Sequence, residues 1–195
     1  MLKPLDLDLV MGSSNVGMIE HGIFVKRRAL KSPDKVVEDL EKVNKWERSE
    51  VFSGVSQHRS NYQVHLTKLC NTTEPHLSTH DKSLFEAFKK GISQYRSFNP
   101  HLEIERDEGI VVLKYASKEE YKEHVDDGRT SHRRLSGLIY LNDKFVGGNL
   151  VFPRQNISIR PEPGMLVLFP SGFAYPHVAK PVKRGVRFVA VTWFS

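Results

Sequence analysis

Cysteine, long apolar runs and an apolar N-terminal stretch are scarce or missing in this sequence of 195 residues. The one cysteine, Cys70, cannot form a disulfide within the chain, which favours a reducing compartment. No apolar run approaches the roughly 18–20 residues that cross a bilayer. The first residues, MLKPLDLDLV, carry acidic side chains where a signal peptide needs an apolar stretch. We therefore expect a cytoplasmic protein without a membrane span.

The composition is that of a folded domain rather than a disordered chain. Hydrophobic residues make up 39% and charged residues 27% of the sequence, enough for a core without disulfide or metal staples. The formal net charge is +6, and the basic excess lies in residues 151–195. Because it is spread along expected strands, we interpret it as a solvated surface with one or two anion-binding residues. A nucleic-acid patch is the alternative.

Helix signals dominate before residue 100 and strand signals after it. One helix is expected to begin at Ser32 and Pro33, with Ser32 as N-cap, and to continue with apolar residues at helical spacing as far as Trp46. A second should begin after Asp81 and stop before Asn99. Its buried side is expected to carry Leu84, Phe85, Phe88, Ile92 and Tyr95.

Residues 12–17 and 53–80 are expected to form loops or short strands, and 53–80 could supply a lid over the site. Seven strands are expected after residue 100, separated by Gly, Pro, Asn or Asp: 103–115, 134–142, 148–153, 157–160, 164–169, 177–182 and 185–194. Their number and spacing predict an antiparallel sandwich or jelly roll. We expect one domain over 1–195, with helical support and lid elements in 1–100 and the β core in 101–195.

Three residues have the chemistry of a metal site. In an extended segment, His124 and Asp126 point to the same side and can bind one cation together. With His177 they would make two histidines and one carboxylate, a set that suits non-haem Fe(II) and leaves positions open. Arg187 offers a planar, permanently charged partner for a carboxylate. Taken singly, each residue also fits an ordinary core histidine or surface ion pair.

Four segments, in this order, carry a family resemblance: VVLKYASKEEYKEHVDD, RRLSGLIYLND, GGNLVFP and PGMLVLFPSGFAYPHVAKPVKRGVRFVAVTWF. The second matches a strand pattern R-x-x-[ST]-x-L-x-Y-L. Residues 111–194 resemble the Fe(II)/2-oxoglutarate-dependent dioxygenases, specifically the prolyl 4-hydroxylase-like branch of small bacterial or viral type. The resemblance implies a double-stranded β-helix, with mainly β structure and supporting helices.

The resemblance also implies the roles of the central residues. His124, Asp126 and His177 would be the iron ligands, and Arg187 would bind the distal carboxylate of 2-oxoglutarate. Tyr140 would donate its hydroxyl to the same carboxylate.

Three outer residues receive roles from the same resemblance. Tyr115 would lie beside the cosubstrate, Arg133 near the substrate entrance, and Trp193 in a wall near the iron. Alternatively, Tyr115 and Trp193 are core aromatics and Arg133 is a surface cation.

The activity that the resemblance implies is hydroxylation of a C–H bond, chiefly of prolyl residues in a protein or peptide, with release of succinate and CO2. Fe(II), 2-oxoglutarate and O2 would be required, and ascorbate is a candidate reductant whose requirement the sequence leaves open. Asp126 favours hydroxylation over halogenation, since related halogenases lack this ligand. The alternatives are an oxygenase acting on a free small molecule such as an amino acid or on nucleic acid, or a non-enzymatic β-sandwich binding module. The nucleic-acid variant is disfavoured because no second arginine follows Arg187.

Overall fold

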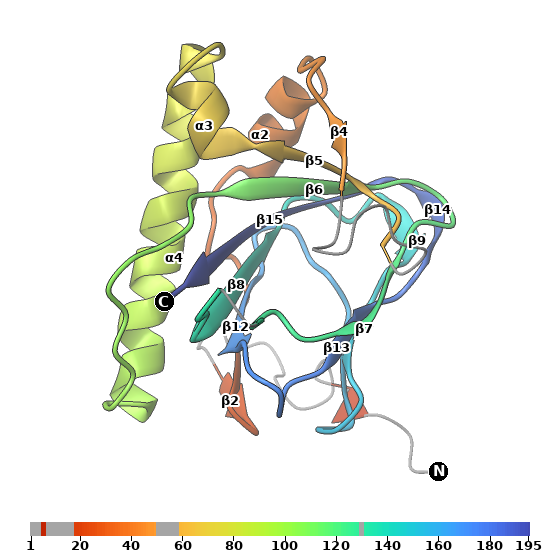
Figure 1. The fold of residues 1–195 in the computed structure, drawn as a ribbon. Helices are drawn as coiled ribbons and strands as arrows, with labels where there is room; N and C mark the ends of the chain where they lie inside the picture. The colour runs from red at the N-terminus through yellow and green to blue at the C-terminus, as the bar shows by residue number, and fades with distance from the viewer. Residues whose placement is uncertain (1–4, 7–17, 50–58, 129–130) are drawn as a thin grey trace.

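Two stacked β-sheets and a layer of helices make up the fold, as seen in a computed structural model that describes residues 5–6, 18–49, 59–128 and 131–195 (Figure 1). The larger sheet has the order β2 (Met18–Glu20), β3 (Ile23–Lys26), β12 (Leu166–Pro170), β8 (Leu135–Tyr140), β15 (Arg187–Phe194), β6 (Val111–Tyr115), β5 (Tyr62–His65), β4 (Glu47–Arg48). The smaller sheet has the order β1 (Leu5–Asp6), β11 (Ile157–Ile159), β10 (Leu150–Phe152), β13 (His177–Ala179), β7 (Tyr121–His124). β14 (Val182–Gly185) pairs with β9 (Phe145–Gly147).

Alternation along the central strands builds a separate core on each face of the larger sheet. On β15, Val189 and Val191 belong to the cluster between the two sheets, whereas Phe188 and Ala190 belong to the cluster beneath the helices. This is the pattern expected when side chains point to opposite faces in turn. The next inward position in the same series is Arg187, so the strand places a guanidinium among apolar side chains.

The helices cover the face of the larger sheet that is turned away from the smaller sheet (Figure 1). They are α2 (Pro33–Leu40), α3 (Leu66–Cys70), the 3-10 turn η1 (Pro75–Leu77) and α4 (Ser78–Phe98). A Cβ on Gly91 of α4 would lie 2.1 Å from Cδ2 of Leu166, so only glycine permits this close approach to β12. No helix among the described residues is long and apolar enough to cross a membrane.

The expected mainly β jelly roll with helices against one sheet is confirmed, but several boundaries were wrong. The first hundred residues are not only helical support, because β2, β3, β4 and β5 all join the larger sheet. Of the expected strand 103–115, only Val111–Tyr115 is a strand. β7, β9 and β14 were not among the expected strands. Short strands that pair only locally at sheet edges have too few residues to show a clear alternation.

The two expected helices exist with different ends. Ser32 and Pro33 stand at the N-cap and the start of α2 as expected, but the φ of Ser32 is 51° and its side chain makes no capping hydrogen bond. α2 ends at Leu40 rather than continuing to Trp46. α4 begins at Ser78 instead of after Asp81. Phe85 is 43% exposed, so it is not on the buried side of α4. Residues 12–17 and part of 53–80 lie outside the described residues; the remainder of 53–80 holds β5, α3, η1 and the start of α4.

Candidate metal centre

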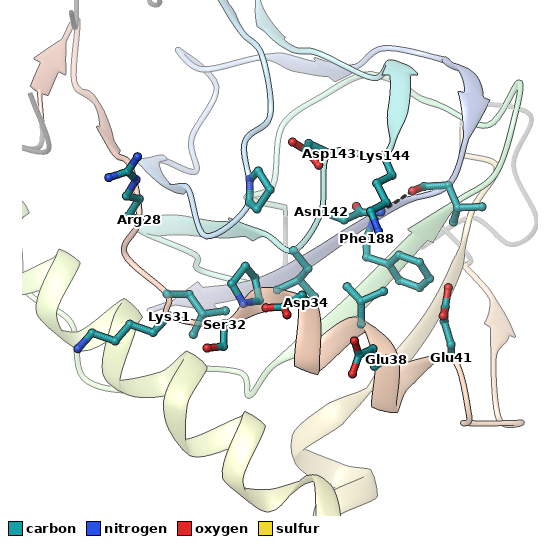
Figure 2. Close-up of a pocket in the computed structure, with 16 residues that line it drawn as sticks. Arg28, Lys31, Ser32, Asp34, Glu38, Glu41, Asn142, Asp143, Lys144 and Phe188 are labelled. Carbon is teal, nitrogen blue, oxygen red and sulfur yellow. Dashed lines mark hydrogen bonds between the residues drawn. The ribbon is translucent and has the colours of Figure 1, made fainter. Parts of the chain in front are cut away.

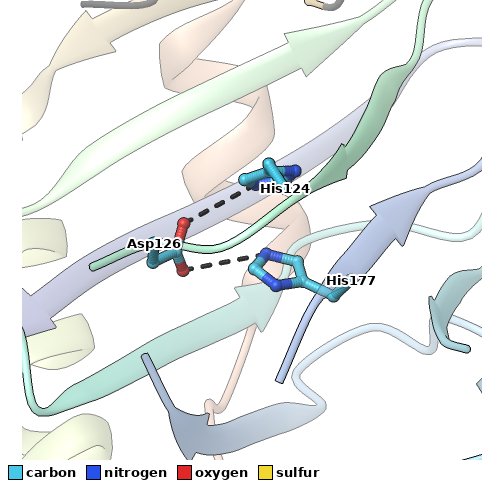
Figure 3. A group of neighbouring side chains, drawn as sticks. All are labelled: His124, Asp126 and His177. Carbon is cyan, nitrogen blue, oxygen red and sulfur yellow. Dashed lines mark ion pairs between the residues drawn. The ribbon is translucent and has the colours of Figure 1, made fainter. Parts of the chain in front are cut away.

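The pairing of β7 with β13 brings the three candidate metal ligands together. His124 and His177 are direct partners in this antiparallel pair, and Asp126 follows two residues after His124. Nε2 of His124 is 3.6 Å from Oδ1 of Asp126, and Nε2 of His177 is 3.7 Å from Oδ2 (Figure 3). One ligand atom from each of the three residues lies within 4.8 Å of the others. A single cation can therefore contact all three side chains.

Both imidazole rings are held so that Nε2 faces the centre. Nδ1 of His124 donates to the carbonyl of Lys122 at 2.8 Å, and Nδ1 of His177 donates to the carbonyl of Tyr175 at 3.2 Å. A carbonyl only accepts, so in a neutral ring the lone pair is left on Nε2. Burial lowers the pKa of His177 to about 4, which keeps that ring neutral near pH 7.

Asp126 supplies the negative charge of the centre. Burial alone would raise the pKa of Asp126, but His177, His124 and a hydrogen bond from Ser136 outweigh it and hold the pKa well below its usual value. Ser136 Oγ lies 2.6 Å from Oδ2 of the carboxylate. Two imidazole nitrogens and one carboxylate oxygen are the donor set that suits non-haem Fe(II) and leaves coordination positions open. The residues present thus fit an iron ion.

A cavity of about 620 Å³ opens beside these three residues. Its walls come from both sheets and include Tyr115, Tyr121, Arg133 and Trp193. The Tyr121 ring stacks on His124 with ring centres 3.4 Å apart and planes 13° from parallel. The expected site residues Tyr115, Arg133 and Trp193 therefore do lie around the space next to the three ligands.

Arg187 is a buried cation without an anionic partner among the described residues. Arg187 is 1% exposed, and its guanidinium lies 4.0 Å from the centre of the Tyr115 ring. Tyr115 is the residue of β6 that pairs with Arg187 of β15. One Nη donates to the carbonyl of Gly148, whereas Nε is buried without a hydrogen-bond partner. Buried charges are normally paired, so this position fits a carboxylate brought by a small ligand such as 2-oxoglutarate.

Tyr140 lies on β8 next to β15 and is 1% exposed. Burial raises its pKa, so the phenol remains protonated and able to donate a hydrogen bond. Tyr140 belongs to the same core cluster as Tyr115. Unlike Tyr115, neither Tyr140 nor Arg187 is among the described residues that line the cavity, so Tyr115 lies between Arg187 and that space.

Arg133 is paired within the protein, which the sequence did not reveal. Its Nε and Nη2 contact the two carboxylate oxygens of Glu108 at 2.6 and 2.5 Å, and its guanidinium lies 3.9 Å from the centre of the Trp193 ring. Glu108 had no motif to mark it, because the pair joins segments distant in sequence. Ser136 was visible only as the [ST] position of the strand pattern, without an assigned partner.

A second cavity of about 800 Å³ lies between α2 and the loop that follows β8 (Figure 2). Its apolar floor includes Val186 and Phe188, and its rim carries both acidic side chains, such as Glu38, and basic ones, such as Lys144. No histidine or cysteine is among the described residues that line it. It is therefore separate in place and in chemistry from the metal centre.

Comparison with known proteins decides the family of the region that carries the centre. The sequence profile described as the 2OG-Fe(II) oxygenase superfamily matches residues 110–195. Residues 110–195 are the part of the chain that matches a 2OG-Fe(II) oxygenase domain, and they hold the three candidate ligands and Arg187. This family uses Fe(II), 2-oxoglutarate and O2, in agreement with the donor set of the centre and the unpaired Arg187.

Curated relatives of this oxygenase domain carry prolyl hydroxylase names. The chain is 43% identical over 70 residues to prolyl 3-hydroxylase 3 of Mus musculus, a match that covers 33% of this chain and 10% of that protein. It is 31% identical over 119 residues to a putative prolyl 4-hydroxylase of Acanthamoeba polyphaga mimivirus, covering 51% of this chain and 48% of that protein. The chain thus spans at most about half the length of these relatives.

Solved structures of other proteins have the same fold as this chain, over both the matched region and the helices that precede it. A prolyl hydroxylase from Trichoplax adhaerens, solved in complex with a hypoxia inducible factor oxygen degradation domain peptide, superposes with a TM-score of 0.74 at 21% identity, covering 89% of this chain and 83% of that one. The viral collagen prolyl hydroxylase of Paramecium Bursaria Chlorella virus-1 gives a TM-score of 0.64 at 16% identity, covering 89% and 95%. At these identities the likeness establishes the double-stranded β-helix.

Proposed function

We propose that this protein is a 2-oxoglutarate-dependent oxygenase that hydroxylates prolyl residues of a peptide or protein. The observation that carries the proposal is the pairing, in one oxygenase domain, of the His124, Asp126 and His177 centre with the buried, unpaired Arg187. The prolyl substrate is supported by the names of the curated relatives, which include 3- and 4-hydroxylases.

Each residue has a defined task in the proposed reaction. His124, Asp126 and His177 hold the iron, and Arg187 pairs with the distal carboxylate of 2-oxoglutarate, with the Tyr140 hydroxyl as a further donor. Tyr115 lies against the Arg187 guanidinium and forms a wall of the cosubstrate site. When bound, iron and 2-oxoglutarate supply O2 activation: one oxygen atom enters the substrate C–H bond and the other enters succinate, with loss of CO2.

The substrate side of the cavity is formed by aromatic faces and a neutralised cation. Trp193 and Tyr121 offer flat surfaces for the pyrrolidine ring and exclude water from it. The Glu108 pair holds the Arg133 guanidinium over the Trp193 ring, and Nη1 donates to the carbonyl of Asp126 at 3.2 Å, which keeps this wall in place. We assign Arg133 and Trp193 to the substrate entrance.

A peptide assay tests the proposal. The full chain, loaded anaerobically with Fe(II) and 2-oxoglutarate, is mixed with O2 and proline-rich peptides, with and without ascorbate. We expect a mass gain of one oxygen atom on a prolyl residue and one succinate per hydroxylation. Matched peptides with alanine for proline should gain nothing, and Asp126→Ala should be inactive.

Two results would contradict the proposal. One is succinate formation without oxygen gain on any proline-containing peptide of a broad panel. The other is hydroxylation of free amino acids alone, which would move the substrate to the small-molecule class.

We also propose that the reaction takes place in a reducing compartment, consistent with the free, buried Cys70.

A further inference from the structure

The three candidate ligands are held in two different ways. His124 and His177 are each oriented by a backbone carbonyl two residues earlier in the chain. The Asp126 side chain instead accepts a hydrogen bond from a distant strand, donated by Ser136 of β8. The carboxylate therefore depends on the sheet for its orientation, whereas the imidazoles depend on their own segments.

A second buried hydroxyl stands behind Ser136. Ser171, the residue after β12, lies with its Oγ 2.8 Å from Oγ of Ser136. Both serines are 0% exposed. In the register of β8 and β12, Ser136 pairs with Phe169 and Leu135 with Pro170, so Ser171 lies diagonally across from Ser136.

The chemistry of the groups sets the direction of this short chain. An ionised carboxylate only accepts, so Ser136 donates its one proton to Oδ2 of Asp126 at 2.6 Å. Ser136 Oγ can then only accept, and Ser171 must donate to it. A hydroxyl that accepts a hydrogen bond becomes a stronger donor, so Ser171 strengthens the bond that Ser136 makes.

Ser171 also anchors the segment that carries the carboxylate. Its carbonyl accepts from the backbone N–H of Asp127 at 3.0 Å, and its own N–H donates to the carbonyl of Arg134 at 3.1 Å. The residue that begins the hydroxyl chain is thus tied by its backbone both to the strand of Ser136 and to the segment of Asp126. These two backbone hydrogen bonds fix Ser171 relative to both Ser136 and Asp126.

We propose that Ser171 and Ser136 form a two-hydroxyl relay that fixes the Asp126 carboxylate for metal binding. Ser136 occupies Oδ2 and stops rotation of the carboxylate, and the Ser171 hydroxyl acts only through Ser136. Both are positioning residues, because their hydroxyls reach the centre only through the Asp126 carboxylate. The inference rests on the metal centre of the proposed function, but not on the identity of the substrate.

Cobalt binding tests the relay without 2-oxoglutarate, O2 or peptide. The apoprotein is titrated with Co(II), and the visible absorption gives both the dissociation constant and the band shape of the bound ion. We expect Ser136→Ala to bind Co(II) about 10–100-fold more weakly with an altered spectrum, as for other residues that orient a ligand. Ser136→Thr keeps the hydroxyl, and should restore both affinity and spectrum.

A double-mutant cycle tests the order of the relay. Ser171→Ala should weaken Co(II) binding less than Ser136→Ala does, since Ser136 still donates. The Co(II) dissociation constant of the double variant should match that of Ser136→Ala within about twofold, because the Ser171 hydroxyl affects the carboxylate only through Ser136. Thr192→Val is the matched control: its hydroxyl is also buried in the larger sheet, without a hydrogen-bond partner among the described residues, and its loss should leave Co(II) binding unchanged.

These measurements distinguish a relay from a purely structural role of the two serines. If Ser136→Ala melts earlier as apoprotein but keeps wild-type Co(II) affinity and spectrum, the serine is only structural and the proposal is wrong. If the two substitutions add, Ser171 acts independently and the relay is wrong. If Ser136→Ala does not fold, Ser171→Ala and Ser136→Thr decide: wild-type binding by Ser171→Ala overturns the relay. Wild-type protein that binds Co(II) but hydroxylates no peptide contradicts only the proposed function.

Discussion

Replacing Arg187 by methionine should make the ligand-free protein more stable and unable to bind 2-oxoglutarate. The guanidinium is 1% exposed and lacks an ion-pair partner among the described residues. Burying an ion takes several kcal/mol even after relaxation. The contact with the Tyr115 ring returns up to about 2 kcal/mol, and the hydrogen bond to Gly148 about 1–2 kcal/mol. Methionine has a similar length and needs neither compensation, so we expect a net gain of about 1–2 kcal/mol.

The assay is thermal unfolding of the apoprotein, followed by the same scan with Mn(II) and 2-oxoglutarate under anaerobic conditions. For a chain of this size, about 1–2 kcal/mol corresponds to a rise in Tm of about 2–8 °C. Wild-type protein should gain about 2.7 kcal/mol when 2-oxoglutarate is present at 100 times its Kd. Arg187→Met should gain nothing from 2-oxoglutarate, so the order of stability of the two proteins reverses when the ligand is added.

Arg184→Met is the matched control, because Arg184 is an exposed cation on the neighbouring strand β14. It should change neither the apoprotein Tm nor the response to 2-oxoglutarate. The expectation is refuted if Arg187→Met melts below wild type without ligand, since the cation would then be stabilising by itself. It is equally refuted if Arg187→Met keeps the wild-type shift with 2-oxoglutarate.

Three further predictions follow from the backbone and from perturbed side chains. Gly148→Ala should lower the free energy of unfolding by about 1–2 kcal/mol in urea, because φ is +71° and the new Cβ would lie 3.2 Å from Arg187; Gly172→Ala, with open space around it, is the control. A hydrogen bond from His80 lowers the pKa of Asp39 from 3.8 to about 2, so the stabilisation is present above pH about 4 and is lost as the pH falls through about 2. The urea midpoint of Asp39→Asn should lie below wild type at pH 6 and approach it by pH 2.5; equal midpoints at pH 6 would argue against the pair. Burial raises the pKa of the Cys70 thiol from 9.0 to about 11, so a thiol reagent at pH 8 should label the folded protein about 100-fold more slowly than the urea-unfolded chain, and equal rates would contradict this burial.

Local sequence patterns predicted the elements that have enough residues to show a period. α4 was visible because apolar residues recur along several turns, and β15 because a long apolar run is buried on both faces. The edges were less predictable. Ser32 has the side chain of a helix cap and stands at that position, but with a φ of 51° it makes no capping hydrogen bond, and its residue type did not indicate this. β7 is short and half-exposed, so its alternation was not recognised.

The candidate site divides in the same way. His124, Asp126, His177 and Arg187 stood out because their residue types and order match a family pattern. The contacts around the site could not be read from the sequence. The ion pair of Arg133 with Glu108 and the hydrogen bond between Ser136 and Ser171 both join segments that are distant in sequence. A pairing between two strands leaves no periodic signal in either one, so such partners appear only when the register is known.

The sequence alone determined the fold class, the donor chemistry of the centre and the residue types around it, because these depend on local patterning and on the intrinsic chemistry of side chains. Only the tertiary structure decided that His124 faces His177, that Arg187 is buried without a carboxylate partner among the described residues, and that Asp126 is oriented by Ser136. The physical reason is that distances, burial and hydrogen-bond direction arise from the register of paired strands, which no single segment specifies.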